Sequence, residues 1–110
     1  MPRIGFQLKV APKHIDEYVR RHAEVWPEML AEIAAAGRRN YSLFLAPDGT
    51  LFGSYDVDDE AAANAYLAAS PVAARWEADM SQFFDGLEGR ADQAASPLVE
   101  VFNLEDQLGA

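Results

Sequence analysis

The residues best suited to carry chemistry lie in one stretch near the N-terminus, Glu17 to Met29. His22 is one of only two histidines in the chain, and an imidazole can accept and return a proton near neutral pH. Tyr18 precedes it by four residues, a spacing that places both on one face of a helix. A buried phenol needs a hydrogen-bond partner and can orient the imidazole or a ligand hydroxyl. The pair therefore indicates acid–base chemistry on a small polar ligand.

The same residues also fit a purely structural role. A core histidine bonded to a strand carbonyl or to a tyrosine would show this spacing, and spacing alone favours that interpretation of His22. Trp26 and Trp76 could offer flat faces to the C–H side of a sugar ring, but they serve equally well as core anchors. Tyr41 begins a predicted strand on its inward face, so its hydroxyl is expected near the end of any pocket.

The remaining charged side chains carry weaker signals. Arg75, beside Trp76, is a lesser candidate for holding a ligand. The two histidines stand eight residues apart with no matched carboxylate cluster, which fits no usual metal spacing, and no glycine loop is of the phosphate-binding kind. We therefore expect no metal site. The other charged candidates are expected at the surface: His14, Arg20, Arg21, Arg38, Arg39, Glu77 and Asp79.

Composition limits the classes of function. The 110 residues suit a single domain, 1–110, with half of them apolar and no run near the roughly 20 residues of a membrane span. The chain has no cysteine, which excludes thiolate chemistry and is compatible with the cytoplasm, where we expect it. No secretion signal is recognisable at the N-terminus. A net charge of −9 disfavours nucleic acid and anionic membranes as partners and leaves a small neutral ligand as the default.

Periodicity predicts an α+β fold of the ferredoxin-like, split βαβ type, an antiparallel sheet with helices on one face. The other sheet face needs cover, and Leu98–Phe102 is apolar on both faces, so we expect a homodimer. The predicted elements, in chain order, are a strand at 3–10, a helical pattern from Pro12 to Gly37 broken at Pro27, strands at 40–46 and 51–57 joined by a hairpin turn, helices from Asp58 or Asp59 to Ala69 and from Ser70-Pro71 to Phe84, a loop at 85–96, and a strand at 98–104.

The run Glu17-Tyr18-x-Arg20-Arg21-His22-x-x-x-Trp26-Pro27-Glu28 resembles the N-terminal signature of the L-rhamnose mutarotase family. The resemblance implies a dimeric ferredoxin-like fold of the α/β-barrel type and cofactor-free interconversion of the α and β anomers of L-rhamnose or a related 6-deoxy sugar. By motif, the family's catalytic histidine falls on His22 and its helix tyrosine on Tyr18. Substrate contacts are then expected from Tyr41, Trp76, Trp26 and Arg75. The resemblance continues through Gly37, Asn40-Tyr41-Ser42-Leu43, Leu51-Phe52-Gly53, Arg75-Trp76, Met80 and Glu100-Val101-Phe102.

This chain departs from the family pattern where the sugar would be recognised. The family tends to carry a tryptophan where this chain has Ala61-Ala62-Ala63-Asn64, and paired tryptophans where it has Trp76-Glu77. Stacking on the sugar is expected to weaken, and Glu77 could supply hydrogen bonds instead. The motif thus indicates the reaction better than the sugar.

Three further questions stay open at the level of sequence. The chain could be a cofactor-free monooxygenase-like enzyme of the same fold, with His22 as base. It could instead be a non-catalytic sugar-binding dimer. Residues 85–96 could also close as a lid over the site.

Overall fold

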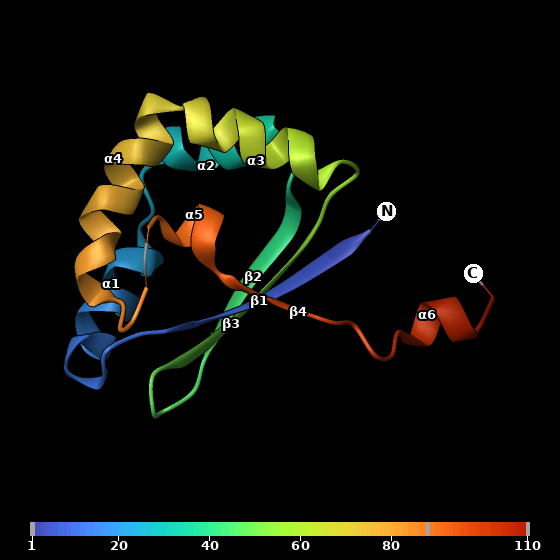
Figure 1. Cartoon of the computed structure of the whole chain (residues 1–110), viewed down its shortest axis with the longest axis horizontal. Coiled ribbons are helices and arrows are strands. Elements are labelled where there is room, and N and C mark those ends of the chain that lie inside the picture. The colour runs from blue at the N-terminus through green and yellow to red at the C-terminus, as the bar shows by residue number, and fades with distance from the viewer. Residues whose placement is uncertain (1, 88, 110) are drawn as a thin grey trace.

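Four antiparallel strands form one sheet in the order β2-β3-β1-β4. The computed structural model describes residues 2–87 and 89–109. Four helices cover one face of the sheet (Figure 1), as the ferredoxin-like α+β prediction requires. The strands are β1 (Arg3–Lys9), β2 (Arg39–Leu45), β3 (Thr50–Asp56) and β4 (Ser96–Leu98), and the covering helices are α1 (Ile15–Ala23), α2 (Pro27–Ala36), α3 (Glu60–Ala69) and α4 (Pro71–Met80). Shorter helical segments are η1 (Pro12–His14), η2 (Ser81–Phe83), α5 (Ala91–Ala94) and α6 (Leu104–Gln107).

Alternation of apolar and polar residues determines which face of β1 is buried. Phe6 and Leu8 point into the core, whereas Gln7 between them is exposed. Phe6 stands opposite Gly53 of β3 in the register. A Cβ at Gly53 would lie 2.1 Å from the Phe6 ring, so only glycine lets this ring cross the neighbouring strand. The sheet face under the helices is therefore closely packed at its centre.

The long helical pattern is divided at the predicted place. α1 ends at Ala23, the backbone of Trp26 is extended with ψ 132°, and Pro27 is the first residue of α2. Proline is favoured there because its missing N–H needs no partner in the first helical turn. Gly37, with φ 96°, then ends α2 in the left-handed conformation. The break at Pro27 and the stop at Gly37 are confirmed.

The second helical pair also begins at predicted caps. The side chain of Asp59 accepts a hydrogen bond from the N–H of Ala62 at 3.0 Å, and that of Ser70 accepts one from Ala73 at 3.1 Å. α4 ends earlier than expected, at Met80, and a 3₁₀ turn continues the chain to Phe83. These caps set the start of the helix that carries Trp76 and Glu77.

The C-terminal part differs from the prediction. The strand expected at 98–104 is wrong: β4 is Ser96–Leu98, paired with β1, and residues 99–103 belong to no helix or strand. Beyond Leu98 the chain leaves the sheet as an extended arm (Figure 1), and Val99 and Val101 are 85% and 91% exposed. A strand needs a neighbouring strand for its hydrogen bonds, and in the part of the chain that the structure describes no strand pairs with the arm. The expected loop at 85–96 contains α5 and the start of β4, apart from residue 88, which lies outside the described residues.

The described residues contain no helix that is both long and apolar enough to cross a membrane.

Candidate active site

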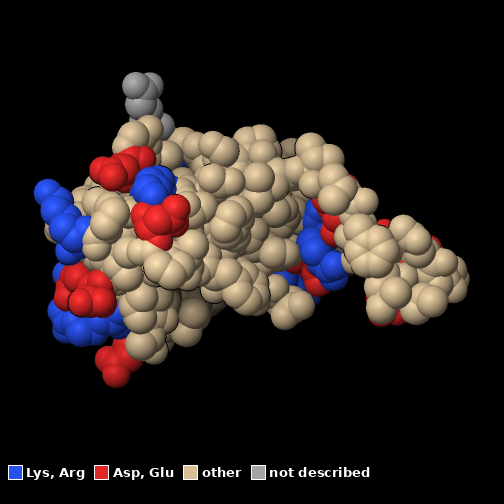
Figure 2. Space-filling view, turned by 90° about the horizontal axis from the view of Figure 1, so that it is seen from below, with Lys and Arg blue, Asp and Glu red and all other residues tan. Residues whose placement is uncertain are grey.

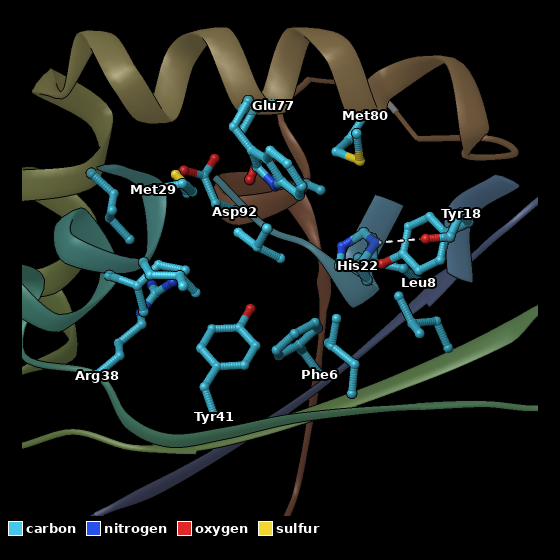
Figure 3. Close-up of a pocket in the computed structure, with 18 of the residues that line it drawn as sticks. Phe6, Leu8, Tyr18, His22, Met29, Arg38, Tyr41, Glu77, Met80 and Asp92 are labelled. Atoms are coloured by element: carbon cyan, nitrogen blue, oxygen red, sulfur yellow. Dashed lines mark hydrogen bonds between the residues drawn. The ribbon is translucent and has the colours of Figure 1, made fainter. Parts of the chain in front are cut away.

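A cavity of about 520 Å³ lies between the sheet and the covering helices. Its size falls in the range of small-molecule sites. Figure 3 shows Tyr18 and His22 toward one end and Arg38, Glu77 and Asp92 toward the other. The lining side chains come from β1, β2, β3 and from α1 to α5, so the site depends on the whole fold rather than on one segment.

His22 presents one nitrogen to the cavity and uses the other to fix its ring. Nδ1 lies 2.9 Å from the main-chain oxygen of Tyr18, shown by the dashed line in Figure 3. A carbonyl oxygen can only accept, so Nδ1 carries the proton and Nε2 keeps its lone pair. Within residues 2–87 and 89–109, Nε2 makes no hydrogen bond. Burial lowers the pKa of His22 below its ordinary value of 6.5, which leaves the ring neutral and able to accept a proton at neutral pH.

Two aromatic side chains hold the His22 ring. The ring of Tyr18 stacks on it at 4.1 Å between centroids, and Trp76 meets it edge-on at 5.5 Å. The stacking confirms that Tyr18 and His22 share one helical face. Tyr18 is only 4% exposed, and this burial raises the pKa of its hydroxyl above the ordinary range. Tyr18 therefore stays protonated at neutral pH and can act as a hydrogen-bond donor.

Tyr41 enters the cavity from the sheet side. Its ring packs against Tyr55 at 4.9 Å and against Phe6 at 6.0 Å, and its hydroxyl points into the cavity (Figure 3). Burial of this hydroxyl raises its pKa, so it too remains protonated. Tyr41 therefore lines the cavity from the inward side of β2, between the two ends.

Two of the sequence candidates do not line this cavity. Trp26 lies behind Trp76, with the two rings edge to face at 5.1 Å, and borders a separate pocket with Arg20 and Arg21. Arg75 is on the exposed side of α4. Adjacent helical residues point about 100° apart, so the turn that brings Trp76 inward carries Arg75 outward.

Glu77 was expected at the surface, and this expectation is wrong. Its side chain lines the cavity and is only 8% exposed. Burial raises its pKa from 4.5 to about 7, and the nearby charge of Asp92 adds to the effect. The helical spacing indicates the buried position of Glu77, because Glu77 follows the inward Ala73 by four residues and precedes the inward Met80 by three.

Arg38 is a second residue wrongly expected at the surface. Its side chain is 3% exposed, and Nη2 donates to Glu60 at 3.0 Å and to Asn64 at 2.6 Å. The guanidinium also lies over the Tyr55 ring at 4.4 Å. These partners come from β3 and α3, so no local pattern around Arg38 could have revealed them.

A sheet covered by helices on one face, with a neutral histidine and protonated tyrosines in a cavity of ligand size, defines the class. The protein is a small α+β domain whose ligand-sized cavity contains an imidazole and two phenol hydroxyl groups. The described residues hold no cluster of three or more histidine and carboxylate side chains arranged to bind a metal ion.

Comparison with known proteins identifies the family. The family model described as L-rhamnose mutarotase matches residues 3–104. The L-rhamnose mutarotase of Acidiphilium cryptum is 37% identical over 105 residues, covering 94% of this chain and 99% of its own length. That of Lactiplantibacillus plantarum is 34% identical and is covered over its full length. The chain belongs to the L-rhamnose mutarotase family, whose activity is the interconversion of sugar anomers, and it is a carbohydrate isomerase.

The solved structures agree. The crystal structure of L-rhamnose mutarotase from Formosa agariphila superposes with a TM-score of 0.78 at 25% identity, covering 94% of this chain and 99% of that one. Tetracenomycin F2 cyclase from Streptomyces glaucescens, a polyketide cyclase, shares the fold with a TM-score of 0.61 at 19% identity. The second likeness concerns the fold alone.

Proposed function

We propose that this chain interconverts the α and β anomers of L-rhamnose or a related 6-deoxy sugar, with His22 as the acid–base group and Tyr18 assisting. The observation that carries the proposal is the geometry of His22. Its Nδ1 is held by the carbonyl of Tyr18, and its Nε2 is unbonded among the described residues and available at the cavity. Family membership supplies the reaction class, and this geometry supports the role of the residue.

The reaction isomerises one sugar molecule by exchanging protons with groups of the protein or water while the C1–O5 bond breaks and re-forms. Nε2 of neutral His22 takes the proton of the anomeric hydroxyl, the C1–O5 bond breaks as C1 becomes a carbonyl, and O5 receives a proton from the Tyr18 hydroxyl or from water. The carbonyl turns about the C1–C2 bond, and O5 attacks its other face. The imidazolium then returns its proton to the new anomeric oxygen, and the group that protonated O5 recovers its own.

The remaining aromatic candidates divide by position. Tyr41 and Trp76 line the cavity, and we assign them to sugar binding through a hydroxyl donor and an apolar ring face. Trp26 does not line the cavity, and its ring packs against Trp76 and supports it. Arg75 is exposed, and the mechanism gives it no task.

Two observations weigh against the other hypotheses. An aromatic substrate for monooxygenase chemistry would offer few hydrogen-bonding groups to the polar side chains Arg38, Glu77 and Asp92 at one end of the cavity. A non-catalytic sugar-binding dimer has no need of an imidazole nitrogen left unpaired beside the ligand. Both therefore rank below anomer interconversion.

Saturation-transfer NMR or polarimetry on L-rhamnose and other 6-deoxy sugars tests the proposal. We expect the purified protein to accelerate anomer exchange and His22→Ala to reduce exchange to the buffer rate. His14→Ala is the matched control, since His14 packs on Phe83 outside the cavity and should leave the rate unchanged. Exchange at the buffer rate for every sugar would refute the function, whereas full activity of His22→Ala would refute only the assigned role.

We further propose that a second copy of the chain covers the open face of the sheet. Phe44 and Phe52 are neighbours in the β2–β3 register and are 65% and 42% exposed. Figure 2, taken from below the sheet, shows a broad uncharged surface with the arm projecting at one side. Apolar residues along residues 99–104 would give that arm a surface to pack on the partner. Light scattering should give twice the chain mass, and Phe44→Glu should shift it toward the single-chain value; a monomeric wild type would refute the dimer.

We also propose that residues 1–110 form a single domain and that the protein acts in the cytoplasm. A single unfolding transition and recovery of the protein in the cytoplasmic fraction of cells are the expected results.

A further inference from the structure

The end of the cavity away from His22 carries polar side chains that the proposed reaction does not use. Arg38 enters from the position just before β2, Glu77 from α4 and Asp92 from α5. Figure 3 shows Glu77 and Asp92 on the helix side of the cavity and Arg38 on the sheet side. These groups face a shared space, so a ligand between them would meet both donors and acceptors.

Arg38 retains an unused donor in this space. Its Nη2 is occupied by Glu60 and Asn64, which hold the guanidinium in place. Its Nε is buried and has no hydrogen-bond partner within residues 2–87 and 89–109. The side chain borders both the main cavity and an adjoining pocket of about 300 Å³. Nε itself is closed off from the cavity, whereas Nη1, which makes no hydrogen bond among the described residues, is the guanidinium nitrogen left to donate to an oxygen atom of a ligand.

Glu77 and Asp92 supply acceptors to the same space. The Asp92 carboxylate is paired with Arg90 at 2.7 Å and its side chain is 6% exposed. The Glu77 carboxyl makes no hydrogen bond or ion pair with another side chain among the described residues, and the main-chain N–H groups of Ala91 and Asp92 lie near enough to favour its charged form. Burial raises the pKa of Glu77 to about 7, so near neutral pH its carboxyl can either accept from a hydroxyl or donate to one.

The balance of charge indicates which kind of ligand fits. Three carboxyl groups, those of Glu60, Glu77 and Asp92, surround the two guanidinium groups of Arg38 and Arg90. An anionic ligand would meet as much repulsion as attraction here. A neutral polyol both donates and accepts hydrogen bonds and suits the mixed set.

We propose that Arg38, Glu77 and Asp92 form a polar subsite that binds the sugar hydroxyl groups opposite the anomeric centre, and that this subsite selects the substrate. The inference rests on the proposed function, because His22 is taken to hold C1 and O5 at the other end of the cavity. In a pyranose, C3 and C4 lie across the ring from C1 and O5. The 3- and 4-hydroxyl groups would therefore reach the subsite, whereas the 2-hydroxyl would not.

Binding of sugars that cannot open their ring tests the subsite apart from catalysis. The probes are 1,5-anhydro-L-rhamnitol and its 2-, 3- and 4-deoxy analogues, titrated by NMR. Wild-type protein should lose about tenfold in affinity when the 3- or 4-hydroxyl is removed, as for a hydrogen bond to a charged group. Glu77→Gln and Arg38→Lys should bind the parent sugar about tenfold more weakly than the wild type does. Their affinity should fall little further when that hydroxyl is removed. Lysine keeps the positive charge but has one terminal nitrogen in place of the guanidinium fork, so the donor at the position of Nη1 is lost.

Controls separate recognition from altered folding. Asp79→Asn changes a carboxylate of the same helix that pairs with Arg21 outside the cavity, and it should bind all probes as wild type does. The 2-deoxy analogue should behave alike in wild type and in both variants. If Arg38→Lys does not fold, Glu77→Gln carries the test alone.

The outcomes also separate this inference from the proposed function. Equal losses for the 3- and 4-deoxy sugars in wild type and variants would overturn the subsite, even with full anomer exchange on L-rhamnose. Failure of wild type to bind the parent sugar would overturn it as well. If removal of the 3- or 4-hydroxyl weakens binding to the wild type but not to the variants, and the wild type catalyses no anomer exchange, the subsite is supported and the proposed reaction is refuted.

Discussion

Replacement of Glu77 by glutamine is expected to stabilise the protein above pH 7 and to change little at pH 4. Burial, assisted by the charge of Asp92, raises the pKa of Glu77 in the folded state from 4.5 to about 7. The folded chain therefore binds this proton more tightly than the unfolded chain, and the contribution of Glu77 to stability falls as pH rises between these two values. The separation corresponds to about 3 kcal/mol in the free energy of unfolding. A neutral glutamine avoids this loss.

Denaturation of wild type and Glu77→Gln from pH 4 to pH 8, at one protein concentration, measures the effect. The difference in free energy of unfolding should grow from near zero to as much as about 3 kcal/mol, a rise in Tm on the order of 10 °C. Glu28→Gln, on the exposed side of α2, is the matched control and should show only a small difference at every pH in this range. A difference between wild type and Glu77→Gln that does not vary with pH, or that is largest at pH 4, would refute the reasoning.

Three further changes have expected outcomes. Gly53→Ala would place a Cβ 2.1 Å from the Phe6 ring and should destabilise the fold by about 1–3 kcal/mol in urea denaturation, whereas Gly5→Ala, with its nearest contact at 3.7 Å, should be tolerated better. Ser70→Ala removes the N-cap of α4 and should lower the free energy of unfolding by about 1 kcal/mol, with Ser70→Thr largely restoring it; equal losses in both would contradict the cap. Because burial lowers the pKa of His22, anomer exchange should fall on the acid side with a midpoint below 6.5, and a midpoint above 6.5 would argue against His22 as the base.

The parts of the fold that the sequence predicted are those determined by neighbouring residues. Alternation placed β1, and the chemistry of proline and glycine placed the break at Pro27 and the stop at Gly37. Capping side chains placed the starts of α3 and α4 at Asp59 and Ser70. Each of these signals acts within about one turn of helix or a few residues of strand, so the rest of the chain does not alter it.

The parts that escaped prediction depend on contacts distant in sequence. An apolar run at 98–104 resembles a strand, but only Ser96–Leu98 finds a neighbour, in β1. Arg38 is buried because Glu60 and Asn64 reach it from more than twenty residues away. Neither outcome is visible in local composition, since both require the arrangement of β3, α3 and the sheet edge to be known first.

The two ends of the cavity differ in how far the sequence could describe them, and the difference follows from what each end does. At the reactive end, His22 and Tyr18 are held by one helix turn, so their arrangement follows from a short motif. At the polar end, Arg38 and Glu77 meet only through the tertiary fold. Burial of the Glu77 carboxyl is unfavourable at neutral pH, which glutamine or an apolar side chain would avoid. A buried carboxyl that lowers stability is best explained by a ligand that uses it, and in this chain that ligand is the distal side of the sugar.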